Sequence, residues 1–197
     1  MSILLIAGSP SQQSRSSALL DSVEQRIQGL VGERRYPVDR LLLRELSPQA
    51  LLLADWGHPS VRRAINRVAD AQAVVVATPV YKAAYSGVLK VFLDLLPQAG
   101  FKEKVVLPLA TGGSPHHMLA LDYALRPVLQ SLGARQILSG VYASDSQVPK
   151  TESGGYQLSE EIEARLADAV SQLVSQLDTR LSGVFPAVHF DQLAYSV

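Results

Sequence analysis

Short runs of consecutive apolar residues recur along the chain and constrain its fold more than any other feature. Runs such as AVVVAT and VVLPLA lack the polar alternation of a half-exposed strand, so both faces of each strand must be covered. A parallel sheet with helices on both faces meets this requirement. The runs predict five strands, at Ile3–Ala7, Val38–Leu43, Ala73–Thr78, Val105–Ala110 and Ile137–Val141.

Helical patterns lie between these runs and after the last of them. The resulting order of strand and helix, with right-handed crossovers, predicts a doubly wound, five-stranded parallel α/β sheet in the flavodoxin-like order 2-1-3-4-5. We expect one domain over residues 1–182 and a tail over 183–197, where helical periodicity is lost. The predicted helices are Ser16–Gln28, Pro59–Ala69, Val88–Leu96, Met118–Leu132 and Ser159–Ser182.

Composition excludes several classes of function. The 197 residues include 18 basic and 18 acidic side chains, so the net charge is zero and gives no electrostatic basis for binding nucleic acid. No basic run or apolar 18-mer indicates a membrane, and the first residues, MSILLIAGS, lack the basic region of a signal peptide. The absence of cysteine excludes disulfides and thiolate chemistry. We therefore expect a cytoplasmic protein.

The loop after the first predicted strand has the composition of a phosphate cradle. Its serine hydroxyls, one arginine and the backbone N–H groups of the helix that follows are all suitable donors to a terminal phosphate. The segment matches neither GxGxxG nor GxxxxGK[ST], so a mononucleotide such as FMN fits better than a dinucleotide or a nucleoside triphosphate. An ordinary polar loop with a serine N-cap is the alternative. The candidate phosphate ligands are Ser9, Ser14, Arg15, Ser16 and Ser17.

Two further loops are predicted at the same edge of the sheet. After the third strand, Pro79, Val80 and Tyr81 form a stiff aromatic turn that suits a flat ligand, although Tyr81 could equally be a surface aromatic. After the fourth strand comes a turn with two glycines, whose backbone could approach a flavin closely and donate N–H groups to its pyrimidine edge; a plain glycine turn is the alternative. Its residues are Thr111, Gly112, Gly113 and Ser114. The polar loop 144–147 is a weaker candidate for contact with the ligand or a neighbouring subunit.

Taken together, these segments resemble the NADPH-dependent FMN reductases of the alkanesulfonate-utilisation (SsuE-like) type. The resemblance implies a flavodoxin-like fold that binds FMN non-covalently, reduces it with NADPH and releases FMNH2 to a partner monooxygenase that desulfonates organosulfonates for sulfur acquisition. It places the serines and Arg15 at the phosphate, residues 79–81 along the isoalloxazine ring and residues 111–114 at its pyrimidine edge. Segment 149–157 and the residues after about 177 match nothing in the family. The likeness is carried by AGSPSQQSRSS, VATPVYKAAYSGVLK, VVLPLATGGS, LDYALRPVL and DSQV, within residues 3–148.

The fourth predicted helix contains an interior proline. Pro127 cannot donate to the carbonyl of Tyr123, so the helix should kink or bulge there. In the family it resembles, this tyrosine belongs to a one-residue π-type insertion at a subunit interface, which implies a homotetramer with Tyr123 in the contact. The alternative is that Pro127 starts a second helix. Asp122 and Arg126 are spaced to form a surface ion pair.

Three functions fit the residues. An NADPH-dependent FMN reductase is preferred, and hydride transfer to a flavin needs positioning of the two rings with no catalytic acid or base. The second is a reductase of the same fold that retains FMN and reduces a quinone, azo dye or oxyanion. The third is a non-enzymatic flavodoxin-type electron carrier. The histidines form neither a metal site nor a hydrolase triad by spacing.

Overall fold

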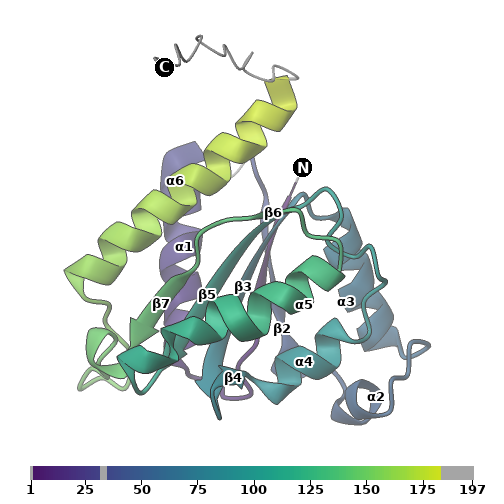
Figure 1. The fold of residues 1–197 in the computed structure, drawn as a ribbon, viewed down its shortest axis with the longest axis horizontal. Helices are drawn as coiled ribbons and strands as arrows, with labels where there is room; N and C mark the ends of the chain where they lie inside the picture. The colour runs from purple at the N-terminus through teal and green to yellow at the C-terminus, as the bar shows by residue number, and fades with distance from the viewer. Residues whose placement is uncertain (1, 32–34, 183–197) are drawn as a thin grey trace, which may run out of the picture.

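A central sheet of parallel strands crosses the molecule, with helices on both of its faces (Figure 1). The computed structural model describes residues 2–31 and 35–182. The main strand order is β2-β1-β3-β5-β6, with β7 also paired to β5 and β4 paired to β3. The strands are β1 (Ile3–Ala7), β2 (Val38–Leu42), β3 (Ala73–Tyr81), β4 (Ala84–Tyr85), β5 (Val105–Gly112), β6 (Gln136–Ile137) and β7 (Val141–Ser144).

The helices account for most of the remaining described residues. The first, second and last predicted helices are present with slightly different ends, whereas the third is shorter than expected and the short helix Pro48–Leu52 was not predicted. The α-helices are α1 (Arg15–Val31), α2 (Pro48–Leu52), α3 (Pro59–Asp70), α4 (Gly87–Leu93), α5 (Arg126–Ser131) and α6 (Glu160–Ser182). Short 3-10 helices lie at Leu43–Glu45, Pro115–Met118 and Asp145–Gln147.

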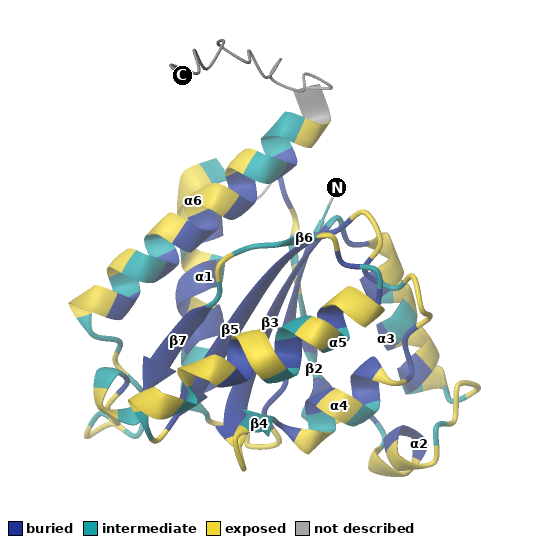
Figure 2. Cartoon of the chain, viewed as in Figure 1, coloured by how far each residue is buried: buried dark blue, intermediate teal, exposed yellow. Residues whose placement is uncertain are grey.

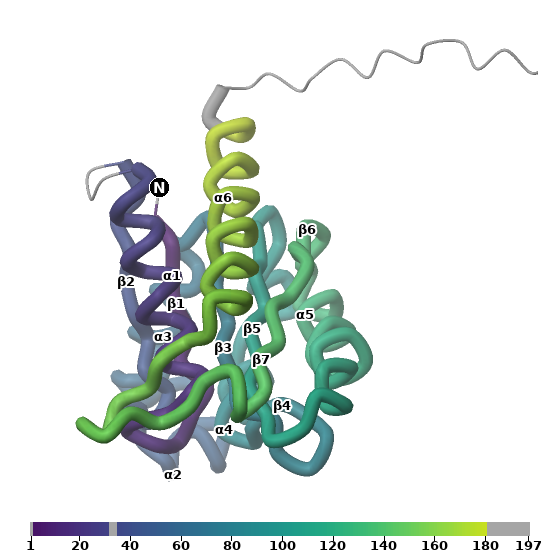
Figure 3. Tube along the Cα trace, turned by 90° about the vertical axis from the view of Figure 1, so that its left-hand side faces the viewer, coloured from purple at the N-terminus to yellow at the C-terminus, as the bar shows by residue number. Residues whose placement is uncertain are grey.

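Alternate residues of each strand enter two separate cores. In β1, Leu4 and Ile6 pack under α3, α4 and α5, whereas Ile3 and Leu5 pack under α1 and α6. Figure 2 shows the central strands β1, β3, β5 and β7 as almost entirely buried, and Figure 3 shows α6 beside α1, with α5 on the other side of the sheet. This two-sided burial is the reason for the continuously apolar runs in the sequence. The doubly wound, flavodoxin-like fold is therefore confirmed.

The fifth position of the sheet differs from the prediction of one strand over 137–141. Ile137 pairs with Val106 and Val141 pairs with Leu109, so the edge strand carries one residue more than β5 between the two pairs. Such an extra residue is a bulge, and it divides the strand into β6 and β7. Two local features favour the break: Pro108 of β5 has no N–H to donate, and a Cβ on Gly140 would lie 3.0 Å from the Pro108 carbonyl oxygen.

The region predicted as one helix over 118–132 is instead three connected pieces. A 3-10 helix (Pro115–Met118) leads into a π-helix (Leu121–Leu125), and α5 begins at Arg126. Pro127 lies in the first turn of α5, directly after the π-helix, so the irregular turn stands where the proline has no N–H to donate to the preceding turn. The predicted tail over 183–197 lies outside the described residues. No helix in the described part of the chain is long and apolar enough to cross a membrane.

Candidate cofactor-binding site

A cavity of about 240 Å³ lies at the carboxyl ends of the strands, where the loops after β1, β3, β5 and β7 meet. Parallel strands deliver these loops to one edge, which is where ligands bind in open α/β sheets. The sequence predicted this edge from the same topology. The cavity is lined by Ser11, Gln13, Ser14, Arg15, Pro79, Val80, Tyr81, Thr111, Gly112, Gly113, Asp145 and Tyr156.

The loop after β1 begins at a glycine that admits no side chain. A Cβ on Gly8 would lie 2.9 Å from the carbonyl oxygen of Ala77 in the neighbouring strand β3. The Gly8 N–H donates to the same oxygen at 2.8 Å, and the Ser86 hydroxyl donates to the Gly8 carbonyl. The start of the cradle is therefore held against the middle of the sheet and against the beginning of α4.

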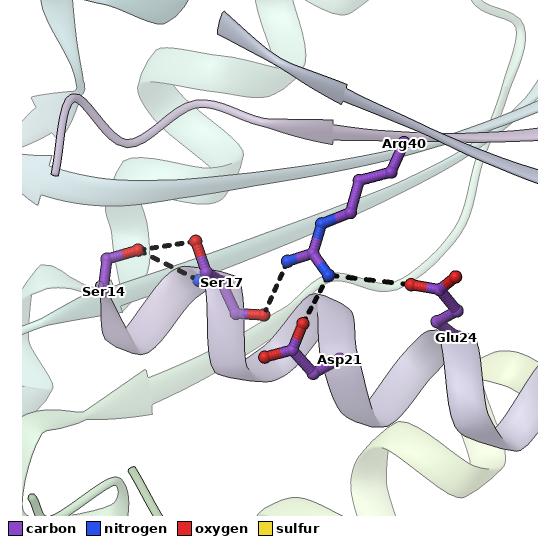
Figure 4. Close-up of polar contacts among 5 residues, drawn as sticks. All are labelled: Ser14, Ser17, Asp21, Glu24 and Arg40. Atoms are coloured by element: carbon purple, nitrogen blue, oxygen red, sulfur yellow. Dashed lines mark hydrogen bonds and ion pairs between the residues drawn. The ribbon is translucent and has the colours of Figure 1, made fainter. Parts of the chain in front are cut away.

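Ser14 closes the amino end of α1 and lies on the cavity wall. Its hydroxyl oxygen accepts the Ser17 N–H at 3.1 Å and lies 2.9 Å from the Ser17 hydroxyl (Figure 4). It also lies 3.2 Å from the Ser16 hydroxyl. Ser9 is buried, and its hydroxyl accepts the Ser11 N–H. Of the predicted phosphate ligands, Ser14 and Arg15 line the cavity, whereas Ser9, Ser16 and Ser17 support it from behind.

An arginine from β2 fixes the first turns of α1 from outside the cavity. Arg40 donates to the Ser17 carbonyl at 3.3 Å, pairs with Asp21 and lies 3.6 Å from Glu24 (Figure 4). The Ser17 carbonyl is tied down in this way, so the cap at Ser14 keeps its orientation. The sequence held no signal for this role, because β2 and α1 are joined only in the folded sheet.

Arg15 lines the cavity and reaches across to the residues that follow β7. Its Nε donates to the Val148 carbonyl at 2.9 Å, and one terminal nitrogen lies 3.3 Å from Asp145 Oδ2. Its Cζ lies 5.2 Å from the centroid of the Tyr156 ring, which is a cation–π contact. The sequence predicted Arg15 but not these partners.

The loop after β3 is a tight hairpin. Tyr81 pairs with Ala84, and the two residues between them, Lys82 and Ala83, have φ of 50° and 64°. Two successive residues with positive φ make the turn whose twist suits a hairpin, although neither is glycine. The turn leaves the Tyr81 side chain half exposed on the cavity wall, where a flat ring could lie against it.

Side chains from the neighbouring strands pack closely against the glycine turn at the end of β5. A Cβ on Gly112 would lie 2.7 Å from the Tyr142 hydroxyl and 3.3 Å from Val80 Cβ, so a larger residue here would have to displace the Tyr142 hydroxyl. The Tyr142 hydroxyl donates to the Ser114 carbonyl at 2.5 Å. Burial, followed by the charge of Asp145, raises the pKa of Tyr142 above its usual 10.0, so ionisation of this donor is moved still further above neutral pH. Ser114 itself caps the next turn and does not line the cavity.

Four lining residues were missing from the sequence prediction: Ser11, Gln13, Asp145 and Tyr156. The first two lie within the predicted loop and could have been included. Asp145 belongs to the polar loop that was ranked lower, and Tyr156 belongs to a segment for which the resemblance implied nothing. Tyr156 forms an isolated antiparallel bridge with Lys150, and no local sequence pattern predicts this pairing.

Tyr123 lies in the π-helix Leu121–Leu125, and its side chain is 80% exposed. Met118 and Leu119 beside it in the chain are also exposed. Arg126 pairs with Asp122 at 3.0 Å, so the expected ion pair is present. Arg126 also donates to the carbonyl oxygens of Ile137 and Leu138, each at 3.4 Å. The role of Tyr123 in a subunit contact stays a prediction.

The donor set of the cavity fits FMN. Ser14, Arg15 and the first N–H groups of α1 supply donors of the kind a phosphate needs. Tyr81 and the exposed backbone at Gly112 and Gly113 supply a flat wall with polar edges. No group of three or more metal-ligating side chains occurs among residues 2–31 and 35–182.

Residues 1–148 match the sequence profile of a protein family described as NADPH-dependent FMN reductase. The chain belongs to this family. The match includes the loops after β1, β3 and β5, and it ends before Tyr156 of the cavity wall. Family membership confirms the prediction of an NADPH-dependent FMN reductase with FMN and NADPH as its ligands.

Individual relatives agree with this assignment. The chain is 49% identical over 148 residues to an FMN reductase (NADPH) of Escherichia coli, covering 75% of each protein. It is 42% identical over 194 residues to an FMN reductase (NADPH) of Pseudomonas putida, covering 98% of this chain and 96% of the relative. The crystal structure of an NADH:FMN oxidoreductase in its apo form superposes with a TM-score of 0.79 at 35% identity, covering 89% of each chain.

Proposed function

We propose that this FMN reductase uses NADPH to reduce FMN as an exchangeable substrate and delivers FMNH2 to a separate monooxygenase that desulfonates organosulfonates. The proposal rests on one observation: three kinds of lining group come together in one cavity. These are the phosphate donors at Ser14 and Arg15, the aromatic side chain of Tyr81 and the glycine backbone at Gly112. The sulfonate role rests on the motif resemblance over residues 3–148.

The residues of this chain contribute binding and orientation. FMN in the cavity would accept the hydride that NADPH carries. The amino end of α1 favours a negative phosphate, and Arg15 adds a positive charge. Backbone N–H groups at residues 112–113 can stabilise negative charge at the pyrimidine edge of the ring. The Tyr81 side chain can lie along the ring plane.

The experiment follows NADPH oxidation by gel-filtered protein as FMN is increased. We expect the rate to saturate with added FMN and the filtered protein to carry little flavin. A second arm adds an FMNH2-dependent sulfonate monooxygenase and measures sulfite, which should depend on both proteins. Relatives described as NADPH-dependent and a fold neighbour described as NADH-dependent make the nucleotide a further variable, so both are compared.

Two results would redirect the assignment. If FMN stays bound through gel filtration and the protein reduces a quinone or azo dye, it retains its flavin and acts on a different acceptor. If FMN binds but NADPH is not oxidised, the protein is an electron carrier. The zero net charge disfavours the carrier, because carriers benefit from a strong field of one sign when they dock.

We further propose that the enzyme is a cytoplasmic homotetramer with Tyr123 in a subunit contact. The support is that three large apolar side chains, Met118, Leu119 and Tyr123, are exposed within a short segment at the π-helix. Burial of such an apolar surface in a subunit contact would be favourable. Light scattering of the native protein and of Tyr123→Ser tests the proposal. A native monomer, or a variant with an unchanged oligomeric state, would contradict it.

A further inference from the structure

Arg15 is the only arginine on the cavity wall among the described residues, and it has three partners in the segment that follows β7. Two of them are neutral: the Val148 carbonyl, which accepts from Nε, and the ring of Tyr156. The third is the carboxylate of Asp145. All three lie in the part of the chain after β7, so the phosphate-binding arginine is tied to a segment remote in sequence.

The two neutral partners contact the guanidinium independently of Asp145. The Tyr156 ring is fixed by a short arm in which Lys150 pairs with Tyr156 and the Gln157 N–H donates to the Pro149 carbonyl at 3.0 Å. The Val148 carbonyl is part of the backbone and cannot turn away. Asp145 is therefore not needed to aim Arg15, and its main contribution is a negative charge on the cavity wall.

A phosphate at the amino end of α1 would share Arg15 with that carboxylate. Arginine has five N–H donors, so the guanidinium can contact both anions at once. The phosphate of FMN carries close to two negative charges at neutral pH. Two anions on opposite edges of one guanidinium are separated by about 6 Å, where their repulsion is substantial even in a water-like dielectric.

We propose that the Asp145 carboxylate repels the flavin phosphate bound beside it at Arg15 and thereby weakens FMN retention. The inference rests on the proposed function, in which FMN must leave after reduction. Asp145 would then lower the affinity for FMN through its position beside Arg15, without contacting the flavin itself. The same carboxylate should matter little for a ligand without a phosphate, because nothing negative would then approach Arg15.

The test compares FMN with riboflavin, which lacks the phosphate, by flavin fluorescence titration. Asp145→Asn should bind FMN about tenfold more tightly and leave the riboflavin affinity unchanged. The gain should shrink as salt is raised, because salt screens exposed charges. Asp145→Glu keeps the charge and should bind FMN as weakly as the unaltered protein.

A matched control separates the local effect from the change in net charge. Asp94→Asn removes a carboxylate from an ion pair with Lys90 that lies outside the cavity, and it should leave the ratio of FMN to riboflavin affinity unchanged. If Asp145→Asn weakens FMN, Asp145 orients Arg15 and the proposal is wrong. Equal effects on FMN and riboflavin would also refute it.

The failure of this inference is distinguishable from failure of the proposed function. Retention of FMN by the unaltered protein through gel filtration would contradict the proposed role of FMN as an exchangeable substrate. The affinity ratio of Asp145→Asn still reports whether the carboxylate opposes the phosphate. Conversely, an unchanged ratio would leave NADPH-dependent reduction of free FMN intact.

Discussion

Replacement of Gly8 by alanine probes the contact that holds the phosphate loop to the sheet. The added Cβ would lie 2.9 Å from the Ala77 carbonyl oxygen and 3.2 Å from Leu89 Cβ. Neither neighbour can retreat easily, because Ala77 belongs to a strand paired on both sides and Leu89 is fully buried in α4. The hydrogen bond from Gly8 to Ala77 must lengthen to relieve the overlap.

The magnitude follows from overpacking. Forcing a methyl group into a filled site costs about 1–3 kcal/mol, and the backbone oxygen in the contact favours the upper half of that range. For a chain of this length, each kcal/mol lowers Tm by about 2–4 °C, so about 2–3 kcal/mol should lower the Tm of Gly8→Ala by roughly 4–12 °C. The displaced loop should also bind FMN more weakly.

The assay is thermal and urea unfolding beside a matched control, Gly87→Ala. Nothing lies within 4 Å of a Cβ on Gly87, which opens α4, so alanine should be neutral or stabilising there by up to about 1 kcal/mol. Equal stabilities of Gly8→Ala and Gly87→Ala would refute the reasoning, because they would show that the loop can move away from Ala77.

Three other substitutions test separate features. Arg15→Ala should weaken FMN binding by about 1.5–3 kcal/mol, since it removes a charge-assisted contact and leaves Asp145 unpaired; an unchanged FMN titration would remove Arg15 from the site. Ala83→Gly should raise the free energy of unfolding by up to about 1 kcal/mol, because φ of 64° strains alanine, and a loss in urea unfolding would contradict this. The hydrogen-bonded partner Arg67 lowers the pKa of Asp39 below its usual 3.8, so the stability from this pair is complete above about pH 4 and is lost as pH falls through the lowered value. Asp39→Asn should flatten this acid-side loss by less than about 1 kcal/mol, as both groups are partly exposed, and an unchanged pH profile would count against it.

Much of the site could be predicted from the sequence because its walls follow strands in chain order. The apolar runs established the parallel sheet, and the sheet places the loops at residues 8–17, 79–81 and 111–113 at one edge. The proline at 127 indicated an irregular helix, although the pattern could not assign the separate 3-10, π and α pieces. The break in the edge strand also escaped prediction, because it depends on how Gly140 meets Pro108 of β5.

By itself, the sequence determined the order of strands and helices, the edge at which ligands bind and the donor types offered to a phosphate. These properties depend on periodicity and composition, which are local. Only the tertiary structure decided which hydroxyls face the cavity and that Asp145 and Tyr156 contact Arg15. Those contacts join residues about 130 or more positions apart, and their distances are set by the register and packing of the whole sheet.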